Sequence, residues 1–105
     1  MAHLDVFQND NPATKKSIPL LLDIQSDLLS QLDTRVVVPL YLQTAGKPAS
    51  MTRLTPTVEI GSKKYIIMTP QLAGVPAKIL KKKVASLPAL HTLLDSALDL
   101  LVTGY

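Results

Sequence analysis

Two apolar runs on either side of a short polar stretch constrain the fold of this chain more than any other feature. The first, Ile18 to Ile24, carries a single charge, and the second, Arg35 to Tyr41, is almost wholly apolar after its first residue. Runs of this length and composition predict buried β-strands. Pro39 has no amide hydrogen, so we expect a bend, a bulge or a sheet edge there rather than an unbroken central ladder.

The polar stretch between the two runs extends from Gln25 to Thr34. Ser26 and Asp27 can cap a short helical turn, which would point Leu28 and Leu29 outward from the edge of the sheet. An exposed pair of leucines needs a partner, so this stretch is a candidate binding segment.

The segments on either side of these runs have weaker patterns. Leu4 to Gln8 alternates apolar and polar residues, which predicts a half-buried first strand. Asn9 to Ser17 is dense in turn-forming residues and predicts a solvated hairpin loop. Leu42 to Leu54 loses periodicity and gains Gly, Pro and Ser, which indicates a long irregular excursion.

A hairpin is predicted in the second half of the chain, where Gly61 and Ser62 join Thr57–Ile60 to Lys63–Met68. The region from Pro70 to Pro76 then predicts a turn, and Ala77–Leu80 predicts a last short strand.

The final segment, Ser86 to about Val102, predicts an amphipathic helix. Ser86 is a plausible N-cap, Pro88 suits the first turn, and Gly104 is a natural stop. Its apolar residues cover an arc of roughly 160° on a helical projection; they are Leu87, Leu90, Leu93, Leu94, Ala97, Leu98, Leu100 and Leu101. This arc is wider than one sheet face requires, and a second subunit could cover the surplus.

The same segment predicts an acidic tip. Asp95 and Asp99 are four residues apart, and Asp99 lies in the last turns, where the helix dipole disfavours an anion by about 0.3 to 1 kcal/mol. The terminal carboxylate of Tyr105 would lie close by. The strip is either ordinary solvated surface or a contact for an Arg-bearing partner.

Length and composition limit the classes of protein to consider. The 105 residues fit one domain spanning 1–105, with 47% hydrophobic residues for a modest core that oligomerisation would help to stabilise. Neither a membrane span nor a signal peptide is indicated, so we expect a cytoplasmic protein. The chain has no Cys, and its net charge of +3 is less than we expect of a dedicated nucleic-acid binder and fits an acidic protein partner equally well.

Catalytic chemistry finds little support in the sequence. His3 and His91 have no carboxylate or second His at metal-ligand spacing, so we expect no metal site and no cofactor. Phosphate-binding glycine loops and nucleophile elbows do not occur.

Four segments together resemble the CcdB family, the toxin half of plasmid or chromosomal toxin–antitoxin pairs. They are Leu22–Leu29 followed by Thr34–Leu40, then Pro56–Ile60, Met68–Pro76, and the tail Thr103-Gly104-Tyr105. The resemblance spans nearly the whole chain. It implies a mostly β fold in which an antiparallel sheet forms a partly open SH3-like barrel, with a small hairpin sheet and one C-terminal helix at a homodimer interface.

The resemblance also implies a target. CcdB-like toxins bind the A subunit of DNA gyrase, trap the cleaved-DNA complex and block replication and transcription. The family's target contacts fall on Leu28, Leu29, Asp99, Val102, Thr103, Gly104 and Tyr105. This chain has Thr103 where well-known members carry Trp, so an aromatic contact to a guanidinium is missing there.

A CcdA-like antitoxin is the second partner that the resemblance implies, and nucleic acid is expected only through the antitoxin complex. The candidate antitoxin residues are Asn9, Asp10, Lys15, Lys16, Lys81, Lys82 and Lys83. The lysine run is either a solvated turn or an attachment surface for an acidic, disordered antitoxin tail.

Two alternatives remain open. Barrel-like toxins of similar fold can be endoribonucleases, which would require cationic and hydroxyl groups such as Arg35, Arg53 or Thr69 around an RNA phosphate. The chain can also be a non-toxic relative that acts only as a binding module.

Overall fold

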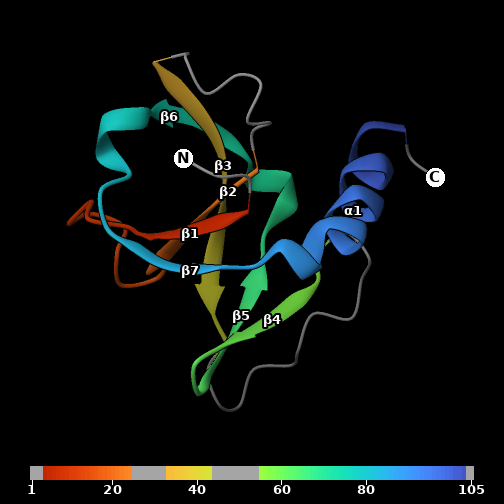
Figure 1. Cartoon of the computed structure of the whole chain (residues 1–105), viewed down its shortest axis with the longest axis horizontal. Helices are drawn as coiled ribbons and strands as arrows, with labels where there is room; N and C mark the ends of the chain where they lie inside the picture. Colours follow the sequence, from red (N-terminus) through yellow and green to blue (C-terminus); the bar gives the residue numbers. More distant parts are fainter. Residues whose placement is uncertain (1–3, 25–32, 44–54, 104–105) are drawn as a thin grey trace.

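Seven strands form one antiparallel sheet in a computed structural model, which describes residues 4–24, 33–43 and 55–103. The strands are β1 (Asp5–Gln8), β2 (Leu20–Asp23), β3 (Thr34–Leu42), β4 (Thr57–Ile60), β5 (Lys63–Ile67), β6 (Ala73–Pro76) and β7 (Lys83–Ser86). Their order is β4-β5-β3-β2-β1-β7, and β6 also pairs with β3. The sheet curls into a half-barrel, and α1 (His91–Thr103) lies at one side of it (Figure 1).

The long strand β3 is the centre of this sheet, as its apolar sequence predicts. One edge of β3 pairs with β2, from Leu20 opposite Leu40 to Asp23 opposite Val37. Its other edge is shared, because residues up to Val37 pair with β6 and residues from Leu40 pair with β5.

Pro39 lies where β3 changes from one of these partners to the other. Its carbonyl accepts a hydrogen bond of 3.1 Å from the Met68 amide, but proline has no amide to return one. The paired residues of β3 and β5 therefore end at Leu40, and on the other side of Pro39 the pairing of β3 with β6 begins at Val37. The predicted break in the ladder is confirmed, although β3 is a central strand and not an edge.

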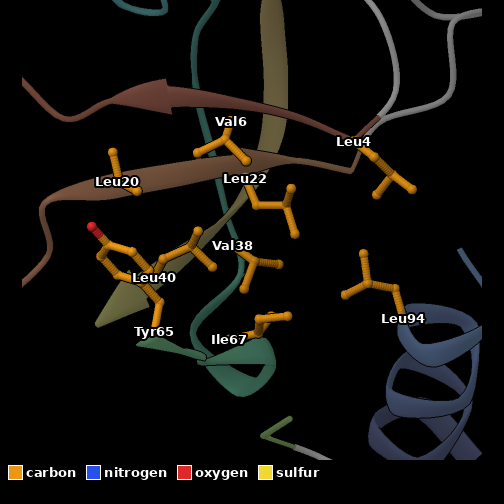
Figure 2. Packing of buried hydrophobic residues seen from close by; sticks show 9 residues of the cluster. All are labelled: Leu4, Val6, Leu20, Leu22, Val38, Leu40, Tyr65, Ile67 and Leu94. Atoms are coloured by element: carbon orange, nitrogen blue, oxygen red, sulfur yellow. The ribbon is translucent and has the colours of Figure 1, made fainter. Parts of the chain in front are cut away.

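Alternation along the strands builds two separate apolar clusters on the two faces of the sheet. The larger contains Leu4, Val6, Leu20, Leu22, Val38, Leu40, Tyr65, Ile67 and Leu94. In Figure 2 the strand residues converge on one space, and Leu94 reaches toward them from α1. The smaller cluster, on what we call the second face, contains Phe7, Leu21, Val37 and Leu80.

Burial on both faces corrects the expectation of a half-buried first strand. In β1, Asp5, Val6 and Phe7 are each at most 5% exposed, because β2 and β7 flank the strand and both faces are covered. The strand also begins one residue later than Leu4, whose φ of 68° is left-handed. Leu4 instead joins β2 to the residue that follows β7, since its amide donates to Asp23 O and its carbonyl accepts from Leu87 N.

The predicted hairpin is confirmed. Strands β4 and β5 pair from Thr57 opposite Ile66 to Ile60 opposite Lys63, and Gly61 in the turn has a φ of 65°. A positive φ at this position favours glycine, because a Cβ would strain the backbone.

The two predictions for the region after the hairpin are wrong. The expected turn from Pro70 to Pro76 contains η2 (Thr69–Gln71) and strand β6, which pairs with β3. The expected last strand, Ala77–Leu80, is instead the 3-10 turn η3 (Ala77–Ile79) followed by a buried Leu80, and the last strand is β7. Residues 73–76 form a strand because they pair with β3, and residues 83–86 form one because they pair with β1. Such long-range pairing leaves no signal in the local sequence.

The C-terminal helix also begins later than predicted. Ser86 is the last residue of β7 and not an N-cap, and the 3-10 turn η4 (Pro88–Leu90) precedes α1. Pro88 does occupy the first turn of η4, where its missing amide hydrogen costs little. The last helical residue is Thr103, and the predicted stop at Gly104 lies outside the described residues.

Candidate functional site

The outer side of α1 carries the described part of the predicted target surface. Val102 is 80% exposed, more than any other large apolar residue in the described ranges. Asp95 and Asp99 are exposed on the same helix, and Nδ1 of His91 lies 3.3 Å from Oδ2 of Asp95, one turn away. Thr103 ends the helix, whereas Gly104 and Tyr105 lie outside the described residues.

The inner side of α1 is attached to the sheet by few residues. Leu94 and Ala97 are buried, while Leu93 is 38% exposed. Other apolar residues of the predicted arc are only half-buried; in α1 they are Leu98, Leu100 and Leu101. In the described chain, apolar surface on this helix therefore exceeds what the sheet covers, as the wide arc predicted.

Leu28 and Leu29 lie outside the described residues, but the chain on both sides of them is held firmly. Arg35 donates from Nε to Oδ2 of Asp23 at 2.9 Å and from Nη2 to Oδ1 at 3.0 Å. Arg35 is 1% exposed and Asp23 is fully buried. Two backbone bonds add to this hold, since Ile24 N donates to Val36 O at 3.1 Å and Ala77 N donates to Asp33 O at 2.7 Å.

A groove lies on the second face beside the loop between β1 and β2. Its volume is about 630 Å³, and Gln8, Asn9, Asp10, Asn11, Leu21, Lys78, Ile79 and Lys81 line it. A smaller hollow of about 250 Å³ shares four of these residues and is lined mainly by apolar side chains, among them Val37, Pro39 and Val75. The two hollows together form an apolar-floored groove with two lysines at its rim.

The structure brings together three of the predicted antitoxin residues, because Asn9, Asp10 and Lys81 all line the groove. Lys15 and Lys16 are exposed in the neighbouring loop. Lys82 is exposed and its carbonyl accepts the Gln8 amide, while Lys83 belongs to β7, with its amine 3.6 Å from Oδ1 of buried Asp5.

Asn9 differs from the other members of this set because its side chain is buried and occupied. Only 5% of it is exposed. Its Nδ2 donates to Thr14 Oγ1 at 3.0 Å and to Ile18 O at 2.7 Å, and its Oδ1 accepts from Asn11 N at 3.1 Å. Asn9 therefore holds the loop that forms one wall of the groove, and its amide faces inward.

Two of the three groups named for an RNA-cleaving site, Arg35 and Thr69, are not on the surface. Arg35 is paired with Asp23 in the interior and Thr69 is fully buried, so neither can meet an RNA phosphate. Arg53 lies outside the described residues. The endoribonuclease interpretation thus loses two of its three groups.

Sequence reasoning missed the ion pair between Asp23 and Arg35. A signal was present, since each residue is a lone charge in an otherwise apolar strand, and a buried charge requires a partner.

The described residues hold no group of three His, Asp or Glu side chains that could bind a metal ion. Nor does any helix in ranges 4–24, 33–43 and 55–103 have the length and apolarity to cross a membrane.

Comparison with protein-family models gives a match that covers nearly the whole chain. The family model described as CcdB protein matches residues 3–104. That range includes both sheet faces, the groove and α1, so the match does not depend on one local motif. The chain therefore belongs to the CcdB family, the toxin components of toxin–antitoxin systems.

Proposed function

We propose that this protein binds the A subunit of DNA gyrase and traps the enzyme in its cleaved-DNA complex, which blocks replication and transcription. It acts by binding alone, without making or breaking bonds itself. The contact surface consists of Leu28, Leu29, Asp99, Val102, Thr103, Gly104 and Tyr105.

The exposure of Val102 is the observation that carries this proposal. A valine that is 80% exposed at the end of a helix contributes little to the fold, and covering it with an apolar surface of a partner would be favourable. Asp99 lies one helical turn earlier, is exposed and adds a negative charge that an arginine of the partner could meet.

The working unit in this proposal is a homodimer. The half-buried leucines of α1 and the exposed Leu93 supply apolar surface that the sheet leaves open in the described chain. A small domain also gains stability from burying such surface against a second copy.

The antitoxin binds the groove on the second face. Lys78 and Lys81 at its rim suit an acidic segment, and its apolar floor suits one or two apolar side chains of that segment. Lys15 and Lys16 extend the positive surface along the loop. Asn9 builds the wall and makes no contact of its own.

A cleavage assay tests the gyrase proposal. Supercoiled plasmid is incubated with gyrase, ATP and the protein, and the DNA is denatured before electrophoresis. We expect linear DNA with the wild type. Val102→Asp should reduce it at least tenfold, because an anchor that is desolvated in the complex then carries a charge.

Val84→Asp is the matched control for this assay, since Val84 is 47% exposed in β7 and lies outside the proposed contact surface. It should leave the yield of linear DNA unchanged. Absence of linear DNA with the wild type would overturn the proposed function, and cleavage of purified RNA by the protein would point to the endoribonuclease instead.

A further inference from the structure

Leu4 has an unusual backbone conformation for a buried residue. Its φ of 68° is left-handed, and in the described ranges no other residue except glycine has a positive φ. The Cβ of an L-amino acid is crowded in this conformation, so a leucine adopts it only where the surrounding contacts outweigh the strain. Leu4 is also 1% exposed, so these contacts come from the interior of the protein.

Three contacts hold Leu4 in this conformation. Its amide donates to Asp23 O at 2.7 Å, and its carbonyl accepts from Leu87 N at 2.9 Å. Its side chain belongs to the main core cluster, and Figure 2 shows it directed toward Leu94 of α1 at one end of that cluster. The left-handed turn thus allows the amide to reach β2 while the carbonyl and the side chain both reach the C-terminal segment.

Leu87 and Leu94 place Leu4 against two separate points of this C-terminal segment. Leu87 directly precedes η4, and its carbonyl accepts from the amide of Leu90 at 3.0 Å, so the helical path begins there. Leu94 lies seven residues later, in the first turn of α1. Contacts at two points fix the direction of a helix, whereas a contact at one point would leave the helix free to tilt.

The direction of α1 matters because its exposed end lies far from this attachment. Leu94 and Ala97 are the buried residues of α1 in the described chain. Val102 lies eight residues beyond Leu94, which is about 12 Å along the axis at about 1.5 Å per residue. A tilt of about 10° would move Val102 by about 2 Å over that length. Binding groups must typically be held within about 0.5 Å of their productive position.

We propose that Leu4 is a positioning residue for target binding: its left-handed backbone and its side chain together fix the direction of α1, and with it the places of Asp99 and Val102 relative to the sheet. This inference rests on the proposed function, because those two residues belong to the proposed gyrase contact. Leu4 itself is buried and touches no target.

The test begins with the backbone of Leu4. Glycine is ordinarily more destabilising than alanine, because it loses more conformational freedom on folding. At a left-handed position this order reverses, so we expect a Tm several degrees higher for Leu4→Gly than for Leu4→Ala. An equal or lower Tm for Leu4→Gly would overturn the left-handed conformation, and the proposal with it.

The direction of α1 is measured next, as the distance between two spin labels. The chain has no Cys, so Val102→Cys in α1 and Lys64→Cys on the exposed part of β5 provide the two labelled positions. The labelled chain is diluted with unlabelled chain, so that distances between copies do not contribute. We expect Leu4→Ala to make the distance distribution at least twice as wide. Leu20→Ala is the matched control, because it removes the same atoms at the opposite end of the cluster, and it should leave the distribution unchanged.

Affinity for the purified gyrase A subunit is measured last, on unlabelled proteins and below the lowest Tm of the set. We expect Leu4→Ala to bind at least tenfold more weakly than the wild type and Leu20→Ala to bind equally well. Leu4→Met keeps an apolar side chain of similar volume and should restore both the distance distribution and the affinity. If Leu4→Ala does not fold, Leu4→Gly carries both measurements, since it loses the same contact with Leu94 without the strain.

The readouts separate the possible failures. An unchanged distance distribution in Leu4→Ala overturns the positioning role whether or not gyrase is the target. A wider distribution with an unchanged affinity overturns the link to binding. A wild type that does not bind gyrase refutes the proposed function and with it the binding role of Leu4, while the distances still decide whether Leu4 fixes the direction of α1.

Discussion

Truncation of Leu94 should be among the most damaging single changes in the C-terminal helix. Leu94 is 2% exposed and is the residue of α1 that belongs to the main core cluster. Leu94→Ala removes three carbon groups from this cluster, which at about 0.8 kcal/mol each amounts to about 2.4 kcal/mol of lost transfer free energy. The cavity that remains raises the total to about 3 kcal/mol.

Thermal and urea denaturation, followed by circular dichroism at one fixed protein concentration, measure this loss. For a domain of this size 3 kcal/mol corresponds to a fall in Tm of at least about 10 °C. Leu72→Ala is the matched control: it removes the same atoms from a side chain that is 37% exposed and lies outside the surfaces assigned to partners, and it should cost less than about 1 kcal/mol. A loss below 1 kcal/mol at Leu94 would refute the view that this residue anchors the helix.

Two further predictions concern loops. Asn9→Ala should destabilise the protein by about 1 to 3 kcal/mol, because it removes three partly buried hydrogen bonds of the β1–β2 loop. Asn11→Ala removes one exposed hydrogen bond and should cost less than about 1 kcal/mol. Equal losses in urea denaturation would contradict the structural role of Asn9. Gly61→Ala should cost about 1 kcal/mol through its positive φ alone, since a Cβ there meets no atom within 4 Å. Gly74→Ala should be nearly neutral, because Gly74 has no positive φ and a Cβ there also meets no atom within 4 Å. A larger fall in Tm for Gly74→Ala than for Gly61→Ala would refute this reasoning.

Much of the sheet could be predicted from sequence because its central strands carry their own signal. The apolar runs that became β2 and β3, and the hairpin with Gly61 at its turn, depend on residues close together in the chain. Even the break at Pro39 followed from one missing amide.

The strands β6 and β7 could not be predicted in the same way. Ala73–Pro76 contains Gly and Pro, and Lys83–Ser86 begins in a lysine run, so neither has the composition of a strand. They form because the edges of β3 and β1 offer unpaired backbone groups at those places. Such pairing depends on the three-dimensional path of the chain, and a short stretch of sequence carries no information about that path.

The groove was missed for a related reason. Its lining comes from the end of β1, the following loop, β2 and η3, segments that lie up to about seventy residues apart in the sequence. Three of its residues were named as candidates, but Leu21 and Ile79 were seen only as parts of strands. Their role in the groove depends on the face of β2 that Leu21 occupies and on the position of η3, which contains Ile79, beside that face.

Apolar and polar side chains stabilise different parts of this protein. The centre of the sheet is held by leucine, valine and isoleucine, whose contacts have no preferred direction. Three of the buried polar residues of the described chain lie at the bases of two connections: Asn9 beneath the β1–β2 loop, and Asp23 with Arg35 at the ends of the β2–β3 connection, whereas Asp5 and Thr69 lie elsewhere. These are the two connections to which we assign partners, the antitoxin for the first and gyrase for the second. A binding loop needs a fixed orientation, and directional hydrogen bonds supply one, so buried polar groups at these two places support the contacts that we propose there.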